Sequence, residues 1–243
     1  MIIFVPYSRL DAKREWGKPP LADCIATPYS LLPTFCSLCY RLPTVNFPGW
    51  LNMTTITTEG LYTFEEYLNY EDGTDNRYEL VDGRLEIMNP PTFRHLLIAK
   101  FIEQALEAEN NRLGLPWLCF KEAGIRTGWR KSRLSDVYVV TKDQVMALLD
   151  QSAVCDTPPL LAVEVVSPDS VKRDYRYKRS EYAALGIIEY WIVDPPKKKV
   201  SLLVLEEGLY QETVLTGNQQ LVSPTFPELM LTVDQVLTAG NLD

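Results

Sequence analysis

Residues 162–195 read AVEVVSPDSVKRDYRYKRSEYAALGIIEYWIVDP, and this stretch decides the fold. It contains an apolar strand, a charged helical segment and then a second apolar strand. The run Leu160–Val166 is apolar enough to be buried on both faces of a sheet, yet Glu164 stands in its middle. An ionised carboxylate in such a place is costly unless a cation, a metal or hydrogen bonds compensate it. Glu164 therefore raises a functional question as well as a structural one.

The overall composition is that of an ordinary soluble globular protein. The chain has 243 residues, of which 46% are hydrophobic and 23% charged, so it can bury a sizeable core. A net charge of -8 argues against nucleic-acid binding by bulk charge alone but leaves room for a local basic patch. Five cysteines without regular spacing indicate a reducing compartment, and no stretch has the apolar length of a transmembrane helix. We therefore predict a cytoplasmic protein without a membrane partner.

The first 52 residues differ from the rest of the chain. They contain seven of the 17 prolines and carry a net charge of +2, against -10 for residues 53–243, and no helical or strand period persists in them. Cys36 and Cys39 form a CxxC pair, but no second pair supplies the other ligands of a zinc site. We predict that residues 1–52 are a disordered or non-native extension and that residues 53–243 form the folded domain.

Regular sequence patterns begin at Thr63. Thr63 and Glu66 form a capping box for a short helix. Asp82-Gly83 is a two-residue turn signal between the strands RYELV and RLEIM. These signals predict a short helix followed by a β-hairpin.

A long helix is predicted next, over residues 92–113, and Gly114 ends it. The residues that we place near its buried face are Leu97, Phe101, Ala105 and Ala108. The remaining predicted elements are strands at 116–127 and 133–140, a helix at 142–150, strands at 199–205 and 209–214, and a closing helix at 232–237. This order indicates an α/β (α+β) fold with a sheet of mixed direction. No GxGxxG or GxxxxGK motif is present, so a doubly wound nucleotide-binding fold is not expected.

Asp136 and Glu164 are candidate metal ligands. Asp136 stands at the polar beginning of the strand 133–140, and Glu164 lies on the strand that follows, so neighbouring strands could bring the two carboxylates together. Two such oxygen ligands, completed by water and a phosphate, suit magnesium. The alternative is purely structural: Asp136 starts a strand and Glu164 pairs with an arginine.

Lys178 lies on one stripe of the helix predicted after Glu164. The stripe consists of Tyr175, Lys178, Tyr182 and Leu185. A lysine among aromatic and aliphatic side chains that face the sheet must reach towards a negative group, and Glu164 precedes the helix by only ten residues. The alternative is an i,i+4 pair between Asp174 and Lys178 on a solvated face, which would not explain the stripe.

Glu79 and His95 are weaker candidates. Glu79 lies in the first hairpin strand before a tight turn, where a glutamate is usually exposed. His95 is the only histidine, and without a second one we interpret it as a satisfied structural imidazole. No cysteine has a histidine near it in sequence, so cysteine nucleophile chemistry has no support.

Several segments spread over most of the chain carry a further signal. They are YELVDGRLEIM with PPTFRHLLIAKFIEQAL, then LSDVYVV, then LLAVEVVSPDS with DYRYKRSEYAALGIIEYWIVDP. In their order and spacing, residues 63–237 resemble a bacterial, largely uncharacterised restriction-endonuclease-like family of the PD-(D/E)XK nuclease superfamily. The resemblance implies a restriction-endonuclease-like core, in which helices flank a mixed β-sheet.

The resemblance also implies roles for individual residues. Asp136 matches the family's metal-binding aspartate, Glu164 its second acidic ligand, and Glu79 the acidic residue of the early hairpin. The implied metal is Mg²⁺ or Mn²⁺, with Glu79 assisting through water or a second ion.

The chain departs from the family motif at two positions. Ser135 replaces the proline that names the motif, and Val166 occupies the position of the motif lysine. Similar families carry the lysine on the following helix, which makes Lys178 the candidate here. Lys178 would orient or help deprotonate the attacking water and offset charge in the transition state.

We therefore predict a magnesium-dependent endonuclease that hydrolyses phosphodiester bonds of nucleic acid, most naturally DNA, as a homodimer. The expected phosphate contacts are Arg126, Arg130, Lys131, Arg133, Lys172, Arg173, Arg176 and Arg179. The alternative is a catalytically inactive module that keeps the nuclease fold for binding or regulation. The net charge and the two motif departures support that alternative.

Overall fold

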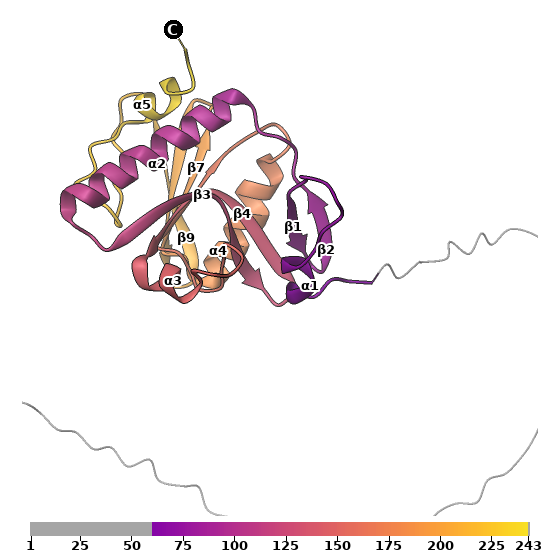
Figure 1. The fold of residues 1–243 in the computed structure, drawn as a ribbon. Coiled ribbons are helices and arrows are strands. Elements are labelled where there is room, and N and C mark those ends of the chain that lie inside the picture. Colours follow the sequence, from indigo (N-terminus) through magenta and orange to yellow (C-terminus); the bar gives the residue numbers. More distant parts are fainter. Residues whose placement is uncertain (1–59, 243) are drawn as a thin grey trace, which may run out of the picture. The chain divides into compact units, whose positions relative to one another are not determined.

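The computed structural model describes residues 60–242, so the extension predicted for residues 1–52 lies outside the described residues. Figure 1 shows the arrangement of the elements. In chain order they are α1 (Phe64–Leu68), β1 (Tyr78–Val81), β2 (Arg84–Ile87), α2 (Phe93–Leu113), β3 (Trp117–Gly128), β4 (Lys131–Thr141), α3 (Lys142–Ala147), β5 (Val154–Cys155), β6 (Leu161–Val165), the π-helix η1 (Arg173–Lys178), α4 (Arg179–Leu185), β7 (Glu189–Asp194), β8 (Lys199–Glu206), β9 (Leu209–Thr216) and α5 (Val233–Thr238). None of the helices in residues 60–242 is both long and apolar enough to cross a lipid bilayer.

One nine-stranded mixed sheet forms the centre of the domain. Its main path runs β2-β1-β4-β6-β7-β8-β9, and β3 pairs with both β4 and β5 beside this path. The pairs β6–β7 and β3–β5 are parallel, and the other pairs are antiparallel. A parallel pair needs a crossover connection, and η1 with α4 provides it between β6 and β7. The predicted mixed sheet flanked by helices is confirmed.

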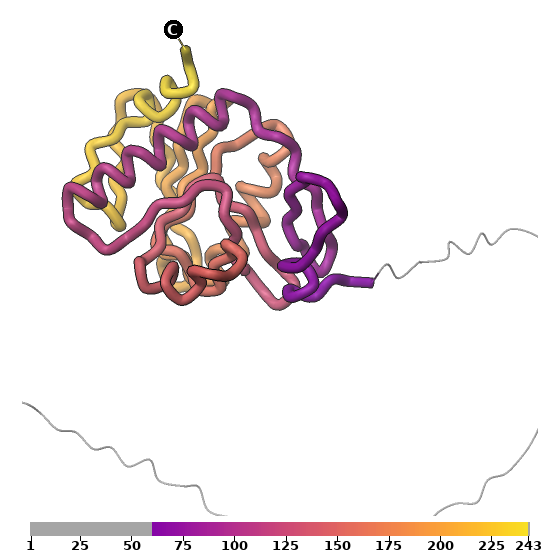
Figure 2. Tube along the Cα trace, viewed as in Figure 1, coloured from indigo at the N-terminus to yellow at the C-terminus, as the bar shows by residue number. Residues whose placement is uncertain are grey.

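Helices cover both faces of the sheet (Figure 1). Because successive side chains of a strand point to opposite faces, β6 contributes to two separate hydrophobic clusters. Val163 belongs to the cluster with Ile102 of α2, and Ala162 belongs to the cluster with Tyr182 of α4. The C-terminal segment with α5 runs along α2 (Figure 2). By this alternation Glu164 lies on the face that α4 covers.

Local sequence signals explain where several elements begin and end. Thr63 opens α1 with a capping box, and the Thr92 hydroxyl caps α2. Gly114 ends α2 with a φ of 63°, a left-handed conformation that favours glycine. Asp82 and Gly83 have φ values of 50° and 82°, as a tight two-residue hairpin turn requires. The predicted capping box, the helix end at Gly114 and the hairpin turn are confirmed.

The buried face of α2 differs from the predicted one. Ile98, Ile102 and Leu106 are fully buried, whereas Phe101 is partly buried and Ala108 is exposed. Two neighbouring stripes of this helix are apolar at helical spacing. The stripe with the larger aliphatic side chains faces the sheet, because it removes more apolar area from water.

Candidate active site

Glu164 and Lys178 form a buried ion pair between β6 and the crossover. Lys178 Nζ lies 2.7 Å from Oε2 of Glu164, and each residue is 2% exposed. The hydroxyl of Tyr182 donates a hydrogen bond of 2.9 Å to Oε1 of Glu164. Lys178 also donates to the backbone oxygen of Leu134 at 2.6 Å. The lysine on the inward stripe therefore reaches the carboxylate in the apolar strand.

Glu79 is completely buried, although its place in a short hairpin strand is typical of an exposed residue. Its Oε2 accepts a hydrogen bond of 2.9 Å from Arg133 Nη1, and its Oε1 accepts one of 3.1 Å from the N–H of Leu134. Lys178 Nζ lies 3.4 Å from the same Oε1. Both carboxylate oxygens of Glu79 are thus engaged, by Arg133 and by Leu134 N–H with Lys178, and neither is free to bind a metal ion in this arrangement.

Asp136 lies where β4 and β6 separate. The pairing of these strands ends at Val137–Val163. Beyond it, Oδ2 of Asp136 accepts a hydrogen bond of 2.7 Å from the backbone N–H of Val165, so the carboxylate is fixed beside Glu164. Asp136 stands in the middle of β4 and not at its beginning, because the hairpin with β3 extends the strand.

His95 contacts Asp136 from the first turn of α2. Its Nε2 lies 3.0 Å from Oδ1 of Asp136, and its buried Nδ1 has no partner within residues 60–242. Burial lowers the pKa of the imidazole, but the hydrogen bond and charge of Asp136 outweigh burial and raise the pKa overall. The interpretation as a satisfied structural imidazole missed this contact. The available signal was a lone histidine three residues after the N-cap of the helix that follows the Glu79 hairpin.

Asp174 is a second residue whose place the sequence did not indicate. It is 1% exposed, and its Oδ2 accepts a hydrogen bond from the hydroxyl of Ser170. Its Oδ1 has no hydrogen-bond partner in the described part of the chain and lies 3.9 Å from Nε of Arg173. The alternative of a solvated Asp174–Lys178 pair is wrong, because both side chains are buried. The π-helix η1, a rare element that often marks functional sites, carries both residues.

Four carboxylates surround the charge of Lys178. Burial raises the pKa of Glu164 well above its usual value, and Asp136 and Asp174 add to this effect while Lys178 opposes it. Burial also favours neutral Glu79, but Lys178 and a second cation outweigh burial and lower the pKa of Glu79. Burial would lower the pKa of Lys178, yet Glu164 and Glu79 hold it above its usual value. The cluster therefore contains a charged lysine and an excess of negative groups.

The donor set fits a hard divalent cation. Asp136 and Glu164 offer carboxylate oxygens, and a cation would stabilise the ionised form of Glu164, whose pKa is raised first by burial and further by the neighbouring carboxylates. Within residues 60–242 no three His, Cys, Asp or Glu side chains form a complete metal site. Mg²⁺ commonly binds through one or two carboxylates, with water and substrate phosphate as further ligands. Asp136 and Glu164 are the residues that could hold it.

The two departures from the nuclease motif are structurally accommodated. Ser135 is 1% exposed, and its hydroxyl donates to the backbone oxygens of Val137 and Val163 at 3.0 and 3.3 Å, respectively. Val166 packs in the same cluster as Tyr182, on the face of the sheet that α4 covers. A lysine at position 166 would point from β6 to this face. Lys178 reaches the same face from the helix layer that covers it.

The predicted phosphate contacts separate into two groups. Arg133 is 2% exposed and pairs with Glu79 and Glu181, so this arrangement is not compatible with a phosphate contact. The guanidinium of Arg126 lies 4.1 Å from the ring centre of Phe64. Exposed or half-buried cations remain at Arg130, Lys131, Lys172, Arg173, Arg176 and Arg179, the last of which pairs with Glu212.

The fold and the geometry of the carboxylates and lysine define a restriction-endonuclease-like protein. The Uma2 family model, described as "Putative restriction endonuclease", matches residues 64–234. The chain belongs to this family.

A solved structure of similar length shares the fold. A crystal structure described as a putative nuclease belonging to DUF820 from Anabaena variabilis has a TM-score of 0.63 and 16% sequence identity, over 74% of this chain and 99% of that chain. The type IIG restriction endonuclease BpuSI has a TM-score of 0.35 and 15% identity, over 63% of this chain and 17% of that chain. A comparison with curated protein sequences finds no match. Family and fold together support a nuclease.

Proposed function

We propose that this protein is a Mg²⁺-dependent endonuclease that hydrolyses phosphodiester bonds of DNA. One observation carries the proposal: Lys178 reaches from the crossover to Glu164, while the N–H of Val165 fixes Asp136 beside it. Two carboxylates and a lysine thus converge at the separating ends of β4 and β6. This is the set that phosphodiester hydrolysis with a metal requires, although Val166 occupies the motif position of the lysine.

Two side chains orient the carboxylates that would hold the ion. His95 Nε2 and the N–H of Val165 each contact one oxygen of Asp136, and the Tyr182 hydroxyl donates to Glu164. Such contacts fix the orientation of metal ligands. A bound Mg²⁺ would supply Lewis-acid stabilisation of phosphate charge and make water a better nucleophile.

Lys178 stabilises negative charge and does not take up a proton. Its ammonium has three N–H donors, and it lies near Glu164, Leu134 O and Glu79 at 2.7, 2.6 and 3.4 Å. The pKa of Lys178 is raised, because nearby carboxylates outweigh the effect of burial. Of the three functions considered for Lys178, the proposal therefore leaves out water deprotonation and keeps orientation of the water and charge stabilisation.

Plasmid nicking tests the proposal. Glu164→Gln should abolish Mg²⁺-dependent relaxation of supercoiled plasmid, and Lys178→Met should slow it by roughly 10²–10³-fold, as removal of one charge-stabilising donor typically does. Glu228→Gln changes an exposed carboxylate and should leave nicking unchanged. Equal nicking by wild type and Glu164→Gln, or none by wild type with Mg²⁺ or Mn²⁺ on several substrates, would overturn the proposal.

A binding module without turnover is the second candidate, and the closed ion pair supports it. Glu164 and Lys178 already neutralise each other out of contact with solvent. Calorimetric titration with Mn²⁺ distinguishes the two functions. A binding site that is lost in Asp136→Ala supports the enzyme, whereas nucleic-acid binding without any metal binding supports the module.

A further inference from the structure

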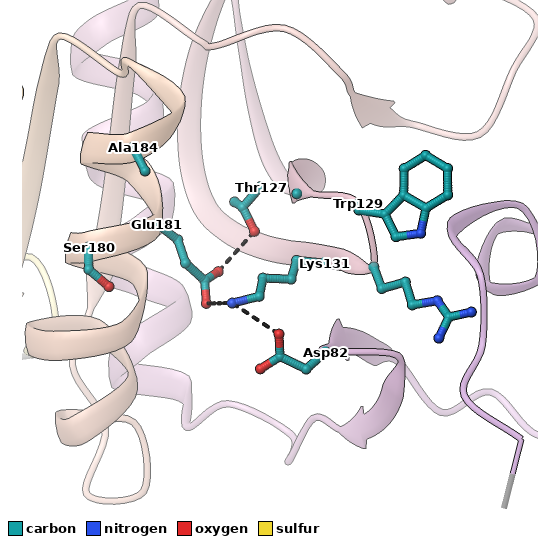
Figure 3. A pocket seen from close by; sticks show the side chains of 9 residues that line it. Asp82, Thr127, Trp129, Lys131, Ser180, Glu181 and Ala184 are labelled. Carbon is teal, nitrogen blue, oxygen red and sulfur yellow. Dashed lines mark hydrogen bonds and ion pairs between the residues drawn. The ribbon is translucent and has the colours of Figure 1, made fainter. Parts of the chain in front are cut away.

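Trp129 is a large exposed aromatic residue that the fold does not require. With Arg130 it forms the two-residue turn between β3 and β4, and 80% of its surface is exposed. Figure 3 shows its indole at the side of a hollow opposite α4, extending away from that helix. A tight turn needs no tryptophan, so the exposed ring is available to contact a ligand.

The hollow beside Trp129 has a volume of about 540 Å³. Its walls come from the β1–β2 turn at Asp82, from the end of β3 at Thr127 and from α4 at Glu181. Lys131 crosses it, with Nζ 3.1 Å from Asp82 and 3.8 Å from Glu181 (Figure 3). This volume is typical of small-ligand sites, which span about 300–1,000 Å³.

The hollow adjoins the carboxylate cluster. A register shift in β3 leaves Thr127 without a partner on β4, and its hydroxyl donates to Oε2 of Glu181 at 2.9 Å. Glu181 also accepts two hydrogen bonds from Arg133, which binds Glu79 on its other side. Glu181 follows Lys178 by three residues, about one helical turn. A polymer held at the cluster could therefore extend into the hollow.

Arg130 places a cation next to the indole. It lines the hollow, its Nε is buried without a hydrogen-bond partner, and it forms no ion pair with any residue of the described range 60–242. Trp129 and Arg130 are consecutive residues of one turn and both line the hollow, so they bring an aromatic ring and a cationic side chain to the same site. Proteins bind unpaired nucleotides with this combination, in which the base stacks on the ring and a cation contacts the phosphate.

We propose that Trp129, Arg130 and the adjoining hollow form a binding site for an unpaired nucleotide of the nucleic-acid substrate. The inference rests on the proposed function, because the ligand belongs to the polymer that the carboxylate cluster cleaves. Bases inside a duplex have both faces covered by their neighbours, so an indole can stack only on a base that is single-stranded, overhanging or flipped out. The site therefore favours substrates with single-stranded segments.

Fluorescence anisotropy tests this site. The probes are a labelled single-stranded DNA oligonucleotide and a blunt duplex of equal length, without divalent cations so that cleavage cannot interfere. Trp129→Ala should weaken single-strand binding by roughly 5- to 150-fold, the range for loss of one base–aromatic stack, and leave duplex binding unchanged. Trp129→Phe keeps an aromatic face and should retain most of the affinity. Leu209→Ala, at another highly exposed apolar residue, on the edge strand β9, should match wild type.

Each alternative result has a defined meaning. Unchanged single-strand binding in Trp129→Ala would overturn the inference and leave the proposed nuclease intact. An equal loss on both probes would assign Trp129 to duplex binding and would also overturn it. If wild type binds neither probe, in the presence of Ca²⁺ as well as without it, both the inference and the proposed function fail.

Discussion

His95 connects α2 to the candidate metal ligand Asp136 through one side-chain contact. His95→Ala should lower the affinity for Mn²⁺ by about 10–100-fold, because an unoriented carboxylate must be ordered when the ion binds. Isothermal titration calorimetry measures this directly. His95→Gln keeps an N–H donor near Asp136 and should recover part of the affinity. If both variants bind Mn²⁺ like wild type, His95 does not orient the ligand.

Glu164 should make stability depend on pH. Its pKa is near 4.5 in the unfolded chain and is raised in the folded protein by burial, so the folded state binds an extra proton between these two values. The resulting stabilisation is complete below pH 4.5 and is lost as the pH rises through the folded pKa. We expect this as a difference in the free energy of unfolding between wild type and Glu164→Gln. As the pH rises from 4.5 through the folded pKa, the difference should fall by about 1.4 kcal/mol per unit of pKa shift.

Urea denaturation at a series of pH values measures that difference. The Glu164→Gln side chain has a similar shape but does not titrate, so the remaining carboxylates act in both proteins. A difference that stays constant from acidic to neutral pH would contradict the raised pKa of Glu164.

The sequence predicted some residues of the buried carboxylate–lysine cluster and missed others for a physical reason. Glu164 and Lys178 stand out locally, since one interrupts an apolar strand and the other interrupts an apolar helical stripe. His95 and Asp174 carry no such contrast. Their places depend on how α2 and η1 cross the sheet, and the burial of Glu79 depends on the distant Arg133.

Gly186 is the residue at which α4 turns towards β7. Its φ is 90°, and a Cβ there would meet no atom within 4 Å, so a substitution is strained by the backbone alone. Gly186→Ala should lower the free energy of unfolding by about 1–2 kcal/mol. Gly186→Asn should lower it less, because asparagine adopts left-handed conformations more readily. Denaturant titration of both variants checks the order, and an equal loss would contradict it.

Elements with clear end signals were predictable, and elements without them were not. The capping box of α1 and the glycine that ends α2 lie within a few residues of the helix ends that they define. The strand β5 has two residues and exists because it pairs with Gly124 and Ile125 of β3. The π-helix η1 likewise has no local signal in the sequence. It is distinguished only in the folded protein, where it buries Asp174 and Lys178.

For the whole molecule, a net charge of -8 means that the proposed binding of DNA would depend on a local cluster of cations. Lys172 and Arg176 are exposed near the start of the crossover, beside the carboxylate cluster. In anisotropy titrations at several salt concentrations, Lys172→Ala with Arg176→Ala should reduce the slope of log K against log salt by about 2. Lys100→Ala with Lys142→Ala removes equal charge from α2 and α3 and should leave the slope unchanged. Equal slopes for both double variants would exclude the crossover from phosphate contact.

In the proposed site, Lys178 supplies from the helix layer the positive charge that the nuclease motif places on the strand, at the position of Val166. A lysine on the strand and a lysine on the helix can then serve the same purpose, provided that either ammonium group ends at the same carboxylate. During divergence such a lysine can move along the chain while the reacting geometry stays in place. Nuclease relatives are consequently better recognised by the convergence of atoms in space than by a fixed spacing of letters.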